Sequence, residues 1–132
     1  MWRKMMRAKI HRATVTFCEV DYVGSITIDE DLLRAAEIRP NEAVAVYDID
    51  NGARFETYVI RGEAGSGVIG INGAAARLVE RGDKVIVVAY GYVQGEDLDE
   101  HVARVVVVDE HNRPSKHLSY SSTLRTPQGT LV

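Results

Sequence analysis

The dipeptide at residues 24 and 25 could carry out chemistry on the chain itself. Glycine at position 24 leaves its carbonyl carbon unshielded and can take backbone angles closed to other residues, and Ser25 places a hydroxyl one bond rotation from that carbonyl. In a strained peptide this hydroxyl can attack backwards and turn the amide into an ester. Elimination across Ser25 would release the chain 1–24, and hydrolysis of the dehydroalanine would leave a pyruvoyl ketone at the start of the chain 25–132. Most Gly-Ser dipeptides are plain turns, so the hypothesis depends on the surrounding residues.

Four motifs, one of which contains this dipeptide, follow one another along the first three quarters of the chain. They are Lys9-Ile10-His11-Arg12, Tyr22-x-Gly24-Ser25-x-x-Ile28-Asp29, Asn51-Gly52-x-Arg54-Phe55-x-Thr57-Tyr58 and Ile71-Asn72-Gly73-Ala74-Ala75-Ala76. In order and spacing this set resembles the pyruvoyl-dependent aspartate 1-decarboxylases, from about Met1 to about Val93. The resemblance implies a carboxy-lyase whose covalent pyruvoyl cofactor, derived from Ser25, forms a Schiff base with L-aspartate. The products would be β-alanine and CO2, for pantothenate biosynthesis, and the family forms homotetramers with sites between subunits.

Two basic residues are candidates for binding the substrate. Loss of CO2 next to an amine requires an electron sink, which a ketone provides by condensing with that amine. Aspartate also carries two carboxylates, so its site needs fixed positive charge. Arg54 suits this because guanidinium binds carboxylate in two-point fashion, and Lys9 is the second candidate. The alternative for both is a solvated strand face, where ion pairs are common and weak.

Two neighbouring hydroxyl residues match the family's catalytic positions. By resemblance, Tyr58 donates the proton to the carbanion, and a phenol with a pKa of about 10 holds that proton at neutral pH. Thr57 matches a substrate-binding residue that acts chiefly during cleavage of the Gly24–Ser25 bond. Adjacent residues of a strand point to opposite faces, so two roles at one site predict a bulge or bend there. The alternative for Tyr58 is a barrel-rim tyrosine with its hydroxyl in water.

The segment Asn72-Gly73-Ala74-Ala75 is predicted to open a short helix. Its first backbone N–H groups lack helical partners and favour an anion, and its small side chains leave room for a substrate carboxylate. The alternative is that Asn72 is simply an N-cap equivalent to Asp29, and both interpretations can hold together.

The resemblance adds three residues that line the site. They are His11, Tyr22 and Tyr47, and some family members carry tryptophan at position 47. Considered alone, His11 fits a satisfied structural histidine better.

The apolar pattern predicts strands and short helices arranged as an internal repeat. Residues 7–23 are expected to form strand, turn and strand, and residues 25–29 a half-buried strand ending at the helix N-cap Asp29. After a helix at 32–37 come a strand at 43–47, a turn at 50–52 and a strand at 54–60. The segment 69–72 then repeats 26–29, with a helix at 75–80 and a strand at 85–87. This duplication favours a small two-fold barrel, and the resemblance implies a mainly β double-psi β-barrel with short helices.

The chain is expected to be one domain with an extension. Residues 1–93 form the predicted barrel domain, cut by self-cleavage into 1–24 and the remainder. Residues 94–132 are a C-terminal extension with one possible strand at 102–108, followed by a mobile tail from Asp109 to which we assign no function.

Composition narrows the partners and the location. The net charge of −3 gives no support for a nucleic-acid surface, and no apolar run reaches the ~20 residues of a membrane span. The basic N-terminus lacks the apolar core of a secretory signal, so a cytoplasmic protein is expected. The single cysteine, Cys18, excludes a cysteine-based metal cluster, and no metal is predicted.

Two alternatives to aspartate decarboxylation remain at this point. One is a pyruvoyl decarboxylase of another amino acid, such as glutamate. The other is an unprocessed barrel that keeps its Gly24–Ser25 bond and serves as a binding or assembly module. Whether cleavage is spontaneous or needs a maturation factor is left open.

Overall fold

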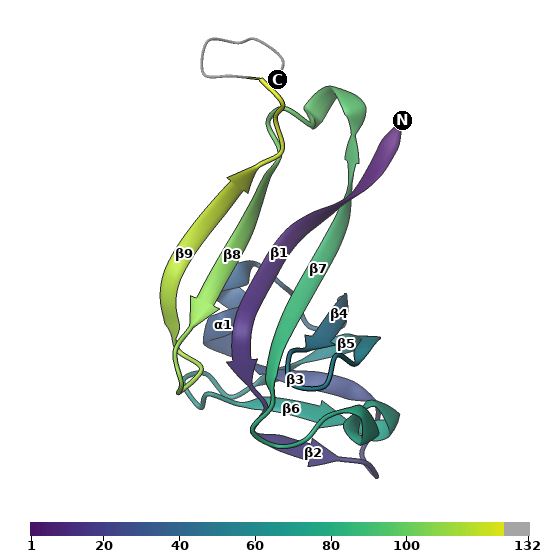
Figure 1. Ribbon diagram of the computed structural model, residues 1–132, viewed down its shortest axis with the longest axis vertical. Coiled ribbons are helices and arrows are strands. Elements are labelled where there is room, and N and C mark those ends of the chain that lie inside the picture. The colour runs from purple at the N-terminus through teal and green to yellow at the C-terminus, as the bar shows by residue number, and fades with distance from the viewer. Residues whose placement is uncertain (126–132) are drawn as a thin grey trace.

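The computed structural model describes residues 1–125, and the fold is mainly β (Figure 1). The strands and helices, in chain order, are β1 (Trp2–Thr14), β2 (Phe17–Glu19), β3 (Ser25–Asp29), α1 (Glu30–Ala36), β4 (Ala43–Asp48), β5 (Arg54–Gly62), β6 (Ile69–Asn72), the 3-10 helix η1 (Gly73–Leu78), β7 (Lys84–Gln94), the 3-10 helix η2 (Gly95–Asp97), β8 (Val102–Val108) and β9 (Pro114–Ser121).

The strands form one strongly curved sheet in the order β2-β6-β3-β5-β4-β7-β1-β8-β9. Its short strands lie together at the lower end of Figure 1, whereas β1, β7, β8 and β9 extend upward as a tall twisted ribbon. Just after β1, the backbone N–H of Thr16 donates to the carbonyl of Ile69 in β6, and that of Val15 donates to Asp83. The chain leaving β1 therefore joins the β6 end of the sheet, which is consistent with the predicted small β-barrel.

The pairing of β3 with β6 supports the predicted internal repeat. These strands are antiparallel, and Thr27 pairs with Gly70, which is its own counterpart in the second copy. On one side of that pair, Ile26 meets Ile71, the counterpart of Ile28. In addition, β5 runs parallel to β3 just as β2 runs parallel to β6. β2 precedes β3 in the first copy but pairs with β6 of the second, and β5 precedes β6 in the second copy but pairs with β3 of the first. This exchange is what a pseudo-twofold axis between β3 and β6 requires.

The core fills the inside of this curved sheet with branched aliphatic side chains. On β1, β4 and the start of β7 its fully buried members alternate with less buried positions, as β-branched residues favour, whereas all four positions of β6 are buried. The largest of them are Ile10, Ile26, Ile28, Leu32, Ile69, Ile71, Val15, Val44, Val46, Val59, Val85 and Val87. Inward and outward faces of the sheet are thus well defined, and this decides where the polar residues on the same strands point.

The first strand and the second short helix differ from the prediction in their limits or type, whereas a predicted helix cap is confirmed. The first strand begins at Trp2 rather than near residue 7, because its N-terminal half pairs with the long β7. The helix predicted at 75–80 is instead the 3-10 helix η1, which starts at Gly73. The N-cap Asp29 is confirmed, since its carboxylate accepts from the backbone N–H of Asp31 at 2.8 Å. That carboxylate also accepts from Gly65 and Gly67, so it fixes the loop before β6.

The C-terminal extension contains more structure than predicted. The strand at 102–108 is present as β8, which pairs in parallel with β1. The prediction of a tail from Asp109 onward is wrong for residues 114–121, which form β9 against β8. All β9 side chains are exposed, and only Leu118 and Tyr120 alternate with polar residues, so the pattern was too short to indicate a strand; β9 pairs with β8 through its backbone. Residues 126–132 of the predicted tail lie outside the described residues.

A buried asparagine ties this extension to the barrel. Asn112 is buried, and its side-chain amide donates to the carbonyls of Thr14 and Gly67, each at 2.8 Å. Its side-chain oxygen accepts from the backbone N–H of Thr14 at 2.7 Å. The turn between β8 and β9 is therefore part of the folded unit.

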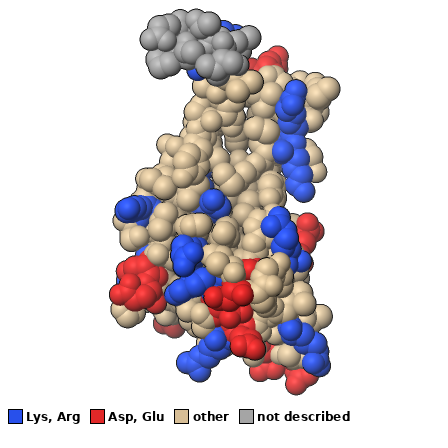
Figure 2. Space-filling model, viewed as in Figure 1, with Lys and Arg blue, Asp and Glu red and all other residues tan. Residues whose placement is uncertain are grey.

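Charged side chains over the barrel carry both signs. Figure 2 shows basic and acidic groups mixed over the lower half of the face it presents. Several belong to exposed ion pairs, such as Arg34 with Glu30 at 3.0 Å and Arg104 with Glu37 at 3.2 Å. Within residues 1–125, no helix has the length and apolar character to cross a membrane.

A buried carboxylate at the end of β4 makes stability depend on pH. Burial, followed by a hydrogen bond to Asp83, raises the pKa of Asp48 above its ordinary value of 3.8. The fold therefore favours protonated Asp48, and the stability this confers is complete below pH 3.8 and is lost as the pH rises through the raised pKa.

We expect Asp48→Asn to stabilise the protein at neutral pH by about 1 kcal/mol, or about 4 °C in Tm. The amide keeps an oxygen for the backbone N–H groups of Asp50 and Asn51 and can donate to Asp83. Thermal unfolding between pH 4 and pH 8 measures this, with the exposed Asp50→Asn as control. An Asp48→Asn effect that is equal at every pH would exclude titration as its cause.

Candidate active site

The Ser25 side chain lies in a buried corner between the β3 and β6 strand ends. Ser25 is fully buried, and its hydroxyl accepts a hydrogen bond from the Asn72 side-chain amide at 2.9 Å. The same hydroxyl donates to the carbonyl of Val23 at 3.2 Å. The hydroxyl is therefore directed toward the residues that precede Ser25, where the peptide bond between Gly24 and Ser25 lies.

Gly73 makes room for Gly24. It has a φ of +73°, and a Cβ at this position would lie 2.5 Å from the Gly24 Cα atom. Both facts demand glycine at position 73. Gly24, by contrast, does not adopt the left-handed conformation that the sequence argument allowed it, and a Cβ there would meet nothing closer than the Asn72 carbonyl oxygen at 4.0 Å. The strained glycine of this corner is thus residue 73.

The Asn72 side chain hydrogen-bonds to residues of the corner and does not cap the helix that follows it. It occupies the N-cap position of η1, but its side chain makes no capping hydrogen bond. Instead the fully buried amide donates to Ser25 and, at 3.1 Å, to the hydroxyl of Thr27. Its Oδ1 atom is buried and has no hydrogen-bond partner within residues 1–125. A buried acceptor without a donor is costly, so this atom is free to serve a polar group formed in the corner.

Tyr58 lies beside this corner. Ile26 pairs with Val59 in the parallel β3–β5 ladder, and Ser25 and Tyr58 each directly precede one member of that pair. Because Val59 is fully buried, Tyr58 lies on the outward face of β5. Its side chain is half-buried.

Thr57 points the other way. It pairs with Val44 of the core, and the β4–β5 register continues from residue 43 to residue 47 without a shift. The bulge or bend that two roles at one site would require is therefore absent from the β4–β5 ladder. The part of Thr57 in cleavage and substrate binding stays a prediction.

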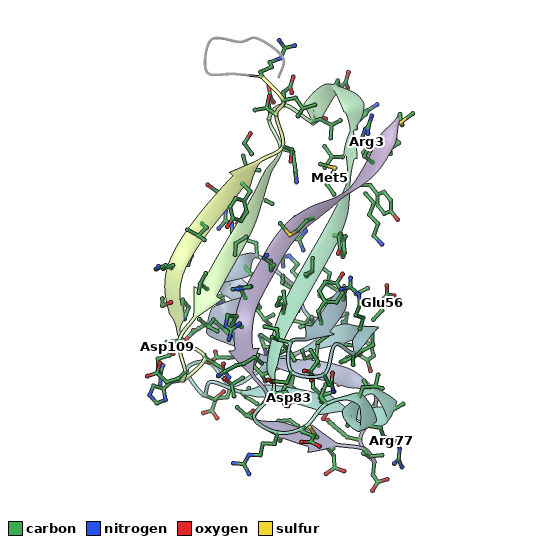
Figure 3. All side chains as sticks on the ribbon, viewed as in Figure 1. Arg3, Met5, Glu56, Arg77, Asp83 and Asp109 are labelled. Carbon is green, nitrogen blue, oxygen red and sulfur yellow. The ribbon has the colours of Figure 1, made fainter. Side chains whose placement is uncertain are left out.

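Arg54 is supported by aromatic side chains on the outward face. Its guanidinium carbon lies 3.8 Å from the centre of the Tyr47 ring, its partner across the β4–β5 ladder. The Tyr47 hydroxyl in turn lies 2.7 Å from the hydroxyl of Tyr90 in β7. Glu56 projects from the same strand face, away from the barrel (Figure 3).

Lys9 and His11 belong to the outward side of β1. Lys9 pairs with Val88 on β7 and lies between the core residues Ala8 and Ile10. Burial, followed by the charges of Lys9 and Arg12, lowers the pKa of His11 below 6.5, so its imidazole is neutral at pH 7. Among the described residues, the buried Nδ1 atom of His11 has no hydrogen-bond partner. This atom therefore departs from the fully satisfied structural histidine that the sequence alone favoured.

The remaining predicted residues border the corner. Ala74 is exposed and Ala75 half-buried on η1, while Tyr22 is exposed and its carbonyl oxygen faces Gly73. Gly24, Ser25, Tyr58, Asn72 and Gly73 thus come together. Along β5, Arg54 lies about 13 Å from Tyr58 at the usual rise per residue. Within one chain, Lys9 and His11 come from β1, which β4 and β7 separate from Arg54 on β5 in the sheet order.

A pyruvoyl group fits the corner. Its ketone carbon would be the Ser25 Cα atom, with the ketone oxygen in place of the backbone nitrogen and a methyl group in place of the hydroxymethyl group, so it needs no more space than serine. The Asn72 amide that now donates to the Ser25 hydroxyl would keep the Thr27 hydroxyl as its acceptor. No metal is needed for this arrangement.

Comparison with known proteins identifies the family. The sequence model described as aspartate decarboxylase matches residues 1–115. The chain belongs to the aspartate decarboxylase family. It is 57% identical over 119 residues to an aspartate 1-decarboxylase of Bacillus cytotoxicus, covering 90% of this chain and 94% of that protein. A Bacillus cereus protein of the same name is 57% identical over 113 residues, which cover 86% of this chain and 89% of the relative.

The match to the aspartate decarboxylase family covers more of the sequence than the four motifs do. It extends past Val93 to residue 115, and thus includes β8 and the turn that carries Asn112. Sequence reasoning also missed Thr27, which shares the Asn72 amide, and Tyr90. Tyr90 and Tyr92 lie on either side of Gly91 and follow the buried Ala89 on β7, so an outward tyrosine could have been recognised there once β7 was placed beside β4.

Proposed function

We propose that this chain is an aspartate 1-decarboxylase that makes its own pyruvoyl group from Ser25. The observation that carries the proposal is the corner itself. A buried serine hydroxyl is held between the Asn72 amide and the Val23 carbonyl, directly after a glycine whose carbonyl carbon is unshielded. Family membership supports the reaction class, and the names of the Bacillus relatives support aspartate as the substrate.

The proposed maturation uses the chain's own atoms and one water molecule. The Ser25 hydroxyl oxygen bonds to the Gly24 carbonyl carbon while the C–N bond breaks, which leaves an ester and a free amine on residue 25. Loss of the Cα proton expels the Gly24 carboxylate and leaves dehydroalanine. Water then replaces the nitrogen, releasing ammonia and leaving the ketone. The products are the chains 1–24 and 25–132.

The proposed roles of the other residues follow from their charge and position. When present, the pyruvoyl group supplies the electron sink for loss of CO2. Arg54 and Lys9 bind the substrate carboxylates, and neutral His11 adds no charge beside Lys9. Tyr58, next to position 25, donates the proton that replaces CO2. Thr57, Asn72, Gly73, Ala74 and Ala75 contact the substrate, and Tyr22 and Tyr47 line the site.

We further propose that the site is completed by a neighbouring subunit in a homotetramer. The separation of Arg54 from the corner within one chain supports this, as does the outward position of both groups. A symmetric assembly could bring the outward face of one subunit against the corner of the next. The expected cytoplasmic location stays a prediction.

The purified protein is expected to convert L-aspartate to β-alanine and CO2 in equal amounts. Proton NMR of the product and release of labelled CO2 measure this, and borohydride treatment, which reduces the ketone, is expected to abolish it. Faster turnover of L-glutamate than of L-aspartate would favour the other decarboxylase. A chain that keeps its full mass and is inactive, even after incubation with a cell extract, would favour the unprocessed binding module.

A further inference from the structure

A row of contacting aromatic and cationic side chains crosses four strands on the outward face of the barrel. The Lys4 ammonium group lies 4.8 Å from the centre of the Tyr90 ring, and the Tyr90 hydroxyl lies 2.7 Å from that of Tyr47. The Tyr47 ring then packs against the Arg54 guanidinium at 3.8 Å. These residues come from β1, β7, β4 and β5, in that order around the barrel. Neither the motifs nor the proposed mechanism gives a role to Tyr90, the tyrosine that hydrogen-bonds to Tyr47 in this row.

The hydrogen bond between the two tyrosines fixes the orientation of Tyr47. Tyr47 pairs with Ile86 on β7, whereas Tyr90 lies beyond Val88, the partner of Ala45. The two rings therefore approach each other along the strand direction, with the small Ala45 side chain between them. A phenol ring has two soft torsions, and anchoring its hydroxyl restricts both. Hydrogen bonding to Tyr47, followed by burial, raises the pKa of Tyr90, so this hydroxyl stays protonated at neutral pH.

A competing carboxylate makes this orientation matter for Arg54. Glu56 lies two residues further along β5 on the same face and lines the groove where the two tyrosines meet, while Arg54 reaches this groove through its contact with the Tyr47 ring. A guanidinium without its aromatic support could turn toward Glu56 and be lost to the substrate. Stacking on Tyr47 instead leaves the N–H donors at the guanidinium edge available for a carboxylate.

We propose that Tyr90 is a positioning residue, which holds the Tyr47 ring beneath Arg54 and so keeps this guanidinium directed at a substrate carboxylate. The inference rests on the proposed function, in which Arg54 binds that carboxylate. It assigns Tyr90 to substrate binding, away from the bonds that are made and broken at residue 25. Loss of the Tyr90 hydroxyl should therefore weaken binding without slowing the chemical step.

The test compares Tyr90→Phe, Tyr47→Phe and the double variant. Both single variants remove the same hydrogen bond, which is worth about fivefold in affinity. We expect each to raise the KM for L-aspartate about fivefold with kcat within twofold of wild type, and the double variant to add nothing further. Tyr92→Phe is the matched control, because this exposed tyrosine borders the same groove without contacting Tyr47 in the described residues, and its KM should be unchanged.

Binding of succinate provides a readout that is independent of turnover. This dicarboxylate lacks the amine and cannot react, so calorimetry measures its Kd directly, and the Kd should rise fivefold in Tyr90→Phe. An unchanged Kd and KM, or additive effects of the two single variants, would overturn the role of Tyr90. A wild-type protein that binds succinate but forms no β-alanine would contradict the proposed function instead. In that case the Tyr90→Phe effect on the succinate Kd still decides the inference.

Discussion

Replacing Ser25 with alanine is expected to leave one full-length chain where the wild type gives two. The substitution removes the oxygen that attacks the Gly24 carbonyl, and no other hydroxyl is adjacent to that bond. Without the ketone, decarboxylation should fall to background. Intact mass spectrometry under denaturing conditions measures the first effect. In wild type it should reveal a chain ending at Gly24 and a longer chain that gains two mass units on borohydride reduction.

The fold of the Ser25→Ala variant should persist, which separates lost chemistry from lost structure. Its methyl group fits the space of the hydroxymethyl group, although the Asn72 amide loses one acceptor and keeps the Thr27 hydroxyl as the other. Circular dichroism and assembly size should therefore match those of wild type. Ser66→Ala, in an exposed turn, is the control for serine replacement and should be processed normally. Two fragments from Ser25→Ala would refute cleavage by this hydroxyl.

Replacing Gly73 with alanine is expected to slow self-cleavage about 100-fold, the effect typical of a displacement of about 1 Å at a reacting bond. The new methyl group would lie 2.5 Å from the Gly24 Cα atom and 2.8 Å from its nitrogen. These are backbone atoms, so the collision displaces the bond to be cut. Pulse-labelled synthesis in a cell-free system, followed by mass analysis of samples taken over time, measures the cleavage rate.

Gly82→Ala provides the matched control for this variant. Gly82 also has a positive φ, +95°, but a Cβ there meets no atom within 4 Å. It therefore carries the backbone strain of a left-handed alanine, about 1 kcal/mol, without the collision. Gly82→Ala should be processed at the wild-type rate with a slightly lower Tm. Equal slowing in both variants would attribute the effect to backbone strain and remove the special role of Gly73.

The sequence predicted those parts of the fold and of the candidate site in which the local residue pattern and the long-range strand pairing favour the same structure. Ile26 and Ile28 alternate with polar residues, and their copy at Ile69 and Ile71 has the same pattern, so the paired central strands could be recognised without coordinates. Asp29 is a typical capping residue followed by an acidic first turn, and its predicted role as the helix N-cap was confirmed.

Features that depend on long-range contacts could not be predicted in the same way. Asn72 has the same place in the repeat as Asp29, yet it donates to Ser25 and Thr27, and this depends on the β3–β6 register. Tyr90 is distant from Tyr47 in sequence, and their contact follows from β7 lying beside β4. The strand β9 buries none of its side chains, and its one short apolar alternation, Leu118 and Tyr120, was too brief to reveal it.

The pseudo-twofold axis has a consequence for how such an enzyme could have arisen. When the repeat is extended by two residues toward the N-terminus of each copy, Gly67 and Val68 are the counterparts of Gly24 and Ser25. The backbone N–H of Asp29 bonds to the Val68 carbonyl, which continues the pairing of β3 with β6. An ancestral pair of identical halves would have had two such corners. Here the second has valine in place of the nucleophile, and Asn112 binds its glycine carbonyl. Under the proposed maturation, one copy would break its own backbone at Ser25, while the other, with Val68 at the equivalent position, would stay intact.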